Sequence, residues 1–157
     1  MVTLSEAHAP HGRMSWAIHE RFLAYVERQV PDAEISCTGG AYREPQGSFC
    51  FPEERSDPSG EFRFRGSVHF TGHGGMLNMR IEDPRIERRG PDYALTVVDT
   101  VEEGSRIDFA ALSAVPHADD DDGAEFDVRI NAFSSQEMGG VYVPGSEMAP
   151  IRVLRKG

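Results

Sequence analysis

The chain has 157 residues, and its 26 acidic against 16 basic residues give a formal net charge of −10. This excess of negative charge disfavours nucleic acid as a partner, because binding to phosphates needs basic side chains. No apolar run approaches the ~20 residues that a membrane-spanning helix requires, and the first residues lack the pattern of a secretory signal. These features predict a soluble, cytoplasmic protein whose length suffices for one core without disulfides.

The first predicted element is an amphipathic helix that follows a flexible leader at residues 1–13. Ser15 is suited to cap a helix from about Trp16 to Val30, and Pro31 ends it. At 100° per residue the apolar side chains cover about half of the helix circumference, and Tyr25 falls at one rim of this stripe. A tyrosine at such a rim packs its ring on the core and leaves its hydroxyl free for a partner.

After Pro31 the helical period gives way to short strand-like runs separated by glycine-rich turns. The predicted strands are Glu34–Thr38, Gly47–Phe51, Glu61–Thr71, Met76–Glu82, Tyr93–Val98, Arg106–Leu112, Glu125–Ala132 and Pro150–Leu154. Eight strands and one helix predict a mostly β fold, an antiparallel β-sandwich or open barrel with the N-terminal helix packed on it.

The clearest alternation of apolar and polar residues spans Glu61–Glu82, with a reversal at Gly74 and Gly75. His73 is predicted at the tip of this hairpin, where a scaffold presents functional groups to a ligand. His69 falls on the same face of the strand, but four strand rises away, roughly 13 Å. The two histidines therefore cannot share one metal ion unless the strand bends.

The chain contains no nucleophile elbow, no phosphate-binding glycine loop and no zinc-protease motif, so a hydrolase is disfavoured. A tyrosine at a helix rim and a histidine at a hairpin tip fit a different chemistry. A phenolate binds ferric haem as an axial ligand, and a histidine that donates a hydrogen bond to the phenolate tunes it. The residues alone also allow the simpler interpretation that Tyr25 packs and His73 faces water. Tyr42, beside a glycine turn, is a second candidate ligand that is more typical of packing.

Five stretches of the chain resemble the HtaA domain, the haem-transport-associated domain of actinobacterial haem-uptake proteins. They are SWAIHERFLAYV at 15–26, GSFCFP at 47–52, FRGSVHFTGHGGML at 64–77, DPRI at 83–86, and GVYVPG with MAP at 140–150. The motifs occur in the family's order across about residues 14–154. The resemblance is therefore far more specific than any single motif.

The resemblance implies a single haem-binding domain at residues 14–157 that holds one haem b in the ferric state. Carried over by motif, Tyr25 would be the axial ligand of the haem iron, His73 its assistant and Tyr142 a further contact. The implied function is to carry, sequester or transfer haem, with a haem donor or acceptor protein as a further partner. The family commonly has Asp after this histidine, where this chain has Gly74, and its members are usually secreted or surface-anchored.

Two other functions fit the same residues. The chain is compatible with an intracellular offshoot that uses the pocket as a biosynthetic or peroxide-using enzyme, or with an interaction β-domain without a cofactor. Arg63, Arg65 and Arg80 are candidates to pair with haem propionates, although a solvent-facing sheet explains them equally well. His19, inside the apolar arc of the helix, is expected to be a partly buried histidine with its own hydrogen bonds.

Overall fold

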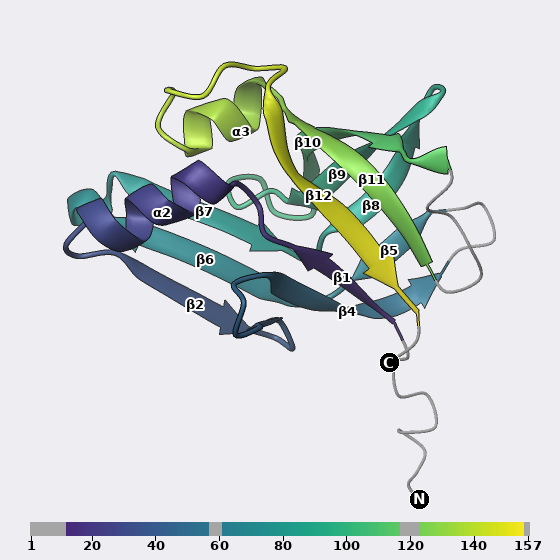
Figure 1. The fold of residues 1–157 in the computed structure, drawn as a ribbon, viewed down its shortest axis with the longest axis horizontal. Coiled ribbons are helices and arrows are strands. Elements are labelled where there is room, and N and C mark those ends of the chain that lie inside the picture. The colour runs from purple at the N-terminus through teal and green to yellow at the C-terminus, as the bar shows by residue number, and fades with distance from the viewer. Residues whose placement is uncertain (1–11, 57–60, 117–122, 156–157) are drawn as a thin grey trace, which may run out of the picture.

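The computed structural model describes residues 12–56, 61–116 and 123–155 (Figure 1). The strands are β1 (Arg13–Trp16), β2 (Glu34–Thr38), β3 (Tyr42–Arg43), β4 (Phe49–Ser56), β5 (Phe62–Phe64), β6 (Ser67–Gly72), β7 (Leu77–Glu82), β8 (Arg85–Arg89), β9 (Asp92–Val98), β10 (Arg106–Ala114), β11 (Gly123–Ile130) and β12 (Glu147–Leu154). The helices are α2 (Glu20–Gln29), α3 (Ala132–Glu137) and a 3₁₀ turn, η1 (His73–Gly75).

Eight antiparallel strands close into a barrel in the order β1-β12-β11-β10-β9-β8-β5-β4, because β4 pairs again with β1. β3 adds to the outer side of β4, and β2, β6 and β7 form a separate three-stranded sheet. The predicted mostly β, antiparallel architecture is confirmed. Strand β1, which makes the closure, lies where the sequence predicts the leader and the start of the helix.

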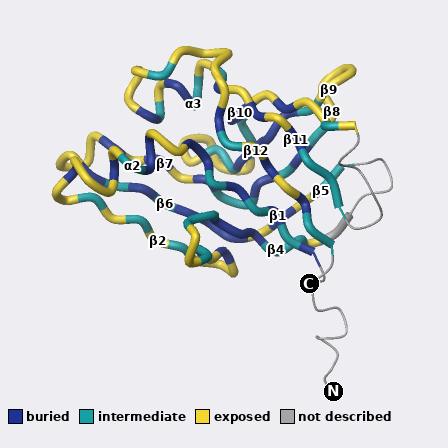
Figure 2. The backbone as a smooth tube through the Cα atoms, viewed as in Figure 1, coloured by how far each residue is buried: buried dark blue, intermediate teal, exposed yellow. Residues whose placement is uncertain are grey.

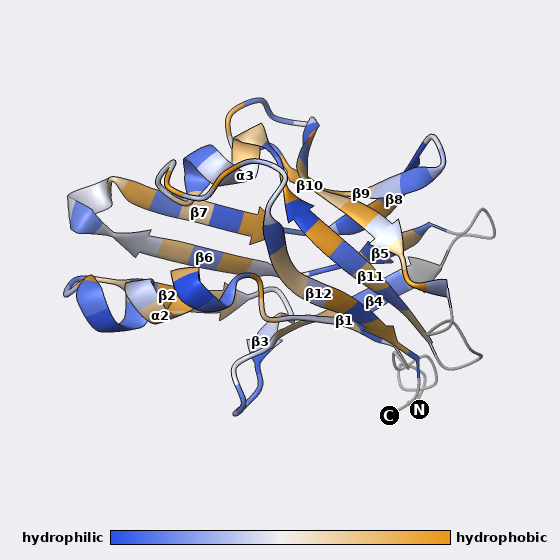
Figure 3. Cartoon of the chain, turned by 45° about the horizontal axis from the view of Figure 1, so that its top comes forward, coloured by the Kyte–Doolittle hydropathy of each residue, from blue (hydrophilic) through white to orange (hydrophobic). Residues whose placement is uncertain are grey.

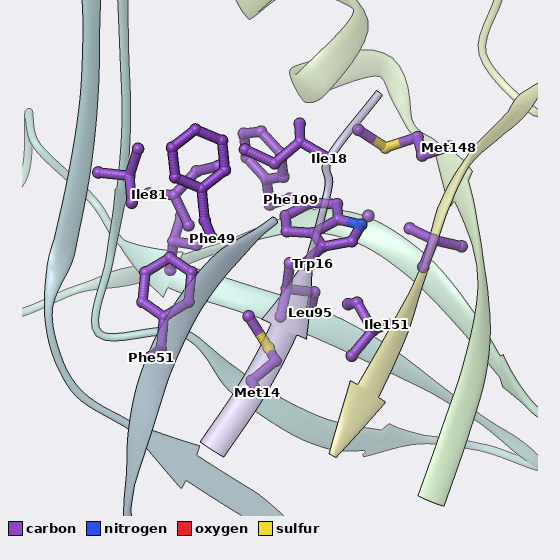
Figure 4. Packing of buried hydrophobic residues seen from close by; sticks show 14 of the residues in the cluster. Met14, Trp16, Ile18, Phe49, Phe51, Ile81, Leu95, Phe109, Met148 and Ile151 are labelled. Atoms are coloured by element: carbon purple, nitrogen blue, oxygen red, sulfur yellow. The ribbon is translucent and has the colours of Figure 1, made fainter. Parts of the chain in front are cut away.

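One continuous core joins the barrel interior to the three-stranded sheet. Trp16 and Phe109 meet edge to face at 6.2 Å between ring centroids, and Met14, Leu95 and Ile151 pack around them (Figure 4). Burial of each such side chain contributes about 1.5–3 kcal/mol. Figure 2 shows the buried positions running along the strands, and Figure 3 shows the apolar and polar alternation along β7. The core therefore fixes the sheet that carries the hairpin tip.

The predicted start of the helix is wrong by four residues. Trp16 lies in β1, where its ring is buried and its indole N–H donates to the carbonyl of Ala149 at 2.7 Å. The chain turns at Ile18, which has a left-handed φ of 63°, and His19 becomes the N-cap by accepting the N–H of Phe22. Contacts in the barrel thus override the helical period at Trp16, and the predicted cap Ser15 lies in β1, where it pairs with β12 and β4.

The predicted strand Glu61–Thr71 is two strands in two different sheets. β5 belongs to the barrel and β6 to the three-stranded sheet, and the chain crosses between them at Gly66. Gly66 has a φ of 113°, and a Cβ there would lie 2.6 Å from the backbone nitrogen of Ala41. Only glycine fits such a crossing, which alternation alone does not reveal.

Residues 1–11 of the predicted leader lie outside the described residues, and Arg13 already belongs to β1.

Helix α3 is not predicted from the sequence. It is capped by a reciprocal pair of hydrogen bonds between Asn131 and Ser134. In the part of the chain that the structure describes, no helix has the length and apolar character to cross a bilayer.

Candidate functional site

Tyr25 and His73 meet at the surface of the domain. The Tyr25 hydroxyl lies 2.7 Å from Nε2 of His73, which is a short hydrogen bond, and the two ring centroids are 5.9 Å apart. The residues come from α2 and η1, and Figure 1 shows this end of the β6–β7 hairpin beside the helix. The two residues predicted as ligand and assistant are therefore in direct contact.

The packing of α2 explains the position of Tyr25. Phe22 and Val26 are buried, and the ring of Phe22 lies 5.7 Å from that of Phe70 in the three-stranded sheet. Tyr25, 38% exposed, lies beside this buried stripe, as the helical period predicts. The hydroxyl therefore points to the hairpin tip while the helix is held by its apolar face.

His73 is held by a residue that the sequence analysis missed. Its backbone is left-handed, with a φ of 51°, and its N–H donates to Oδ1 of Asp32 at 2.9 Å. The N–H of Gly74 donates to Oδ2 of the same carboxylate at 2.8 Å. The two backbone hydrogen bonds, from Gly74 and from His73, hold the pKa of Asp32 below its ordinary value. A carboxylate in the turn after the helix is common, so no sequence signal distinguishes Asp32.

The hydrogen-bonded pair borders an open cavity of about 730 Å³. One side of it is formed by α2, η1 and the start of β7, and the other by α3 and the loop that follows. Its lining residues are Phe22, Tyr25, His73, Met76, Leu77, Gln136, Glu137, Met138, Gly139, Val141 and Tyr142. Met76 and Val141 are 89% and 73% exposed. The lining thus combines apolar side chains in contact with solvent and a few polar groups, as ligand sites do.

Tyr142, the third predicted site residue, forms part of the cavity wall. Its ring centroid lies 4.3 Å from that of His19 and 6.3 Å from that of Phe22, which it meets edge to face. The Ser135 hydroxyl donates to the Tyr142 carbonyl at 2.6 Å and fixes the loop. Burial raises the pKa of Tyr142, so its phenol stays neutral near pH 7. Tyr142 therefore presents an uncharged ring to the cavity.

Two charged residues flank the cavity. Glu137 lines it from α3, and burial raises the pKa of its carboxyl group. Arg21 lines an adjoining recess of about 310 Å³ that shares Val141 and Tyr142 with the cavity. Within the described residues no carboxylate lies at ion-pair distance from Arg21, which precedes Tyr25 by four residues. Residues at this spacing are neighbours on one helix face.

Other candidates from the sequence lie elsewhere. His69 is hydrogen-bonded to Asn78 at 2.6 Å and to Arg80 at 3.3 Å, outside the cavity. None of the three arginines proposed for propionates (Arg63, Arg65 and Arg80) is among the described residues that line the cavity. Tyr42 is an exposed residue of β3 and is also absent from that lining.

No group of three or more His, Cys, Asp or Glu side chains in the described ranges is placed to hold a bare metal ion. The geometry of Tyr25 and His73 instead offers one phenol oxygen, supported by an imidazole, at the side of a largely apolar cavity.

Comparison with known proteins agrees with the fold. The family model of HtaA matches residues 11–154. The chain belongs to the HtaA family. The C-terminal domain of HtaA from Corynebacterium glutamicum is similar over 90% of this chain and 93% of its own, with 23% identity and a TM-score of 0.73.

Two further solved structures from the same organism are similar. The N-terminal domain of HtaA matches with 23% identity and a TM-score of 0.68, over 93% of this chain and 97% of that one. Heme binding protein HtaB matches with 19% identity and a TM-score of 0.70, over 90% of each chain. A comparison with curated proteins gives no match. At these identities the similarity establishes the HtaA fold for this chain.

Proposed function

We propose that this HtaA domain binds one ferric haem b and carries, sequesters or transfers it, with Tyr25 as the axial ligand. The observation that carries the proposal is the 2.7 Å hydrogen bond between Tyr25 and His73 beside the 730 Å³ cavity. The similar protein HtaB, described as a heme binding protein, supports it at the level of the family.

The cavity suits haem in size and chemistry. Its volume lies within the ~300–1,000 Å³ typical of sites for small molecules. Its two sides leave an open mouth, and Met76 and Val141 expose apolar surface there that a bound macrocycle would cover. Exposed apolar side chains that gather at a cavity mouth are a sign of a binding site.

His73 supports the phenolate that the proposal requires. A tyrosine has an ordinary pKa of about 10 and is neutral at pH 7, so its anion needs a positive centre and a hydrogen-bond donor. With the imidazole proton on Nδ1, the neutral Tyr25 hydroxyl donates to Nε2 of His73. When Tyr25 is a phenolate, a proton on Nε2 lets the imidazole donate to the same oxygen across the same 2.7 Å. A ferric haem bound beside Tyr25 would supply the positive centre that favours the phenolate.

The residues in and beside the cavity would orient a bound haem. Tyr142 and Phe22 offer rings against a flat ligand. Arg21, one helical turn from Tyr25, is placed to pair with a propionate through the adjoining recess. The mouth leaves part of the ligand accessible, which suits exchange with a haem donor or acceptor protein.

A hemin titration of the purified protein tests the proposal. We expect a saturable one-to-one complex with the visible spectrum of high-spin ferric haem bound by tyrosinate. Tyr25→Phe removes only the hydroxyl and should abolish that spectrum and weaken binding about a hundredfold or more, the loss expected for a metal–ligand bond plus its hydrogen bond. Tyr42→Phe, an exposed tyrosine outside the cavity, is the matched control and should bind as the wild type does. Unchanged binding and spectrum in Tyr25→Phe would refute Tyr25 as the ligand.

A further inference from the structure

The hairpin tip that carries His73 is joined to α2 and the segment that follows it at three points. Tyr25 contacts the imidazole of His73 from the helix, and Asp32 accepts two backbone N–H groups from the turn that follows the helix. At Gly72 the two segments approach so closely that a Cβ would lie 2.7 Å from Cγ1 of Val30. The tip is therefore docked against the segment that also carries the proposed haem ligand.

The conformation of this tip is unfavourable on its own. His73 has a φ of 51° and Gly74 a φ of 62°, and the left-handed region disfavours a side chain such as that of His73. Successive left-handed or turn residues direct their backbone N–H groups to one side, and an anion placed there stabilises the conformation. The two carboxylate oxygens of Asp32 occupy this position, one for each N–H group.

We propose that Asp32 is a positioning residue, which holds His73 in the backbone conformation that brings its imidazole to Tyr25. The inference deepens the proposed function and rests on it. The residue after His73 in this chain is Gly74, which has no side chain. Its backbone N–H donates to the carboxylate of Asp32. The carboxylate acts on the haem ligand only through His73.

Asp32→Asn is the most selective variant. An NH₂ group, which can only donate, replaces one carboxylate oxygen, while the shape of the side chain is kept. One backbone N–H then faces another donor and loses its acceptor. Glu34→Gln is the matched control, since it removes the same charge from an exposed side chain two residues further on. Both variants should retain the fold, because residue 32 is exposed and outside the core.

The first measurement needs no haem. We expect the amide hydrogens of His73 and Gly74 to exchange with solvent about tenfold faster or more in Asp32→Asn, and unchanged in Glu34→Gln, because charged hydrogen bonds protect amides. Equal exchange in wild type and Asp32→Asn would refute the positioning role of Asp32, whether or not the protein binds haem.

The second measurement is a double-mutant cycle for hemin affinity. Asp32→Asn should weaken binding about tenfold and shift the tyrosinate charge-transfer band in the direction that His73→Ala shifts it. In the His73→Ala background, Asp32→Asn should have no further effect. Additive losses would overturn the positioning role even if the proposed haem function holds. Failure of the wild type to bind hemin would instead refute the proposed function. The exchange measurement would still decide whether Asp32 holds the backbone of His73 and Gly74.

Discussion

The Tyr25 hydroxyl lies 2.7 Å from Nε2 of His73, although the two lie 48 positions apart in the chain. Each partner is held by contacts of its own, Tyr25 by the packing of Phe22 on Phe70 and His73 by the carboxylate of Asp32. The pair is therefore assembled by the fold before any ligand arrives. A preassembled pair lowers the entropic cost of binding, because neither side chain has to be ordered later.

Replacement of His73 by alanine should weaken hemin binding less than loss of Tyr25 does. A hydrogen bond to a charged group is worth about 1.5–3 kcal/mol, so the expected loss is roughly 10- to 150-fold. The charge-transfer band of the bound phenolate should also shift, since its oxygen loses a donor. His69→Ala is the control, because His69 contacts Asn78 and lies outside the cavity. A spectrum and affinity identical to those of the wild type would show that the hydrogen bond has no part in haem binding.

Arg21→Ala tests the orientation of the ligand. If Arg21 pairs with a propionate, the variant should lose about 0.2–1 kcal/mol of hemin affinity, roughly 1.4- to 5-fold, as expected for an exposed ion pair. Its affinity for hemin dimethyl ester, which lacks the carboxylates, should equal that of the wild type. Arg28→Ala removes a second exposed arginine of α2 and should affect neither ligand. Equal losses for hemin and its ester would exclude the ion pair.

The sequence predicts the elements with a clean period but not the ones fixed by distant contacts. Strand Glu34–Thr38 has the predicted bounds because its alternation is undisturbed. Trp16 fits the helical stripe equally well, yet it lies in β1 because the barrel interior buries more of its ring than a helix surface could. Closure by β1 depends on pairing with residues up to 141 positions away, which no local pattern contains.

The site shows the same division. Helical period places Tyr25 at the rim of a stripe, and the glycine turn places His73 at a tip, but only the family resemblance brought the two together before the structure did. Asp32 could not be found, because its role depends on the backbone N–H groups of a loop 41 residues away. The strand arginines Arg63, Arg65 and Arg80 do not line the cavity, since alternation says nothing about which sheet face borders it.

Stability should fall as the pH drops from 7.5 to 5.5, and His19 should account for part of the loss. Burial, and secondly the charge of Arg21, lowers the pKa of His19 below its ordinary value of about 6.5. At a pH between the lowered pKa of folded His19 and its ordinary pKa, the unfolded chain binds more protons than the folded one. Unfolding therefore becomes easier as the pH falls through 6.5. The fold keeps His19 neutral, with Nδ1 accepting the N–H of Phe22.

His19→Asn isolates this contribution, because asparagine caps a helix equally well and does not titrate. Urea unfolding at both pH values should show a smaller loss of stability in the variant. Glu137, whose raised pKa acts in the opposite direction, is present in both proteins and cancels in the difference. An unchanged pH dependence in His19→Asn would show that His19 is not the titrating group.

Gly66→Ala should destabilise the domain far more than Gly90→Ala. Both glycines have a positive φ, 113° and 63°, but only at Gly66 would the new methyl group meet backbone, 2.6 Å from the nitrogen of Ala41. At Gly90 nothing lies within 4 Å, so the cost is limited to the left-handed conformation, about 1–2 kcal/mol. At Gly66 backbone strain of about 1–3 kcal/mol is joined by overpacking of a further ~1–3 kcal/mol. Urea denaturation of the two variants measures the difference, and equal midpoints would contradict the close approach of β5, β6 and the loop at Ala41.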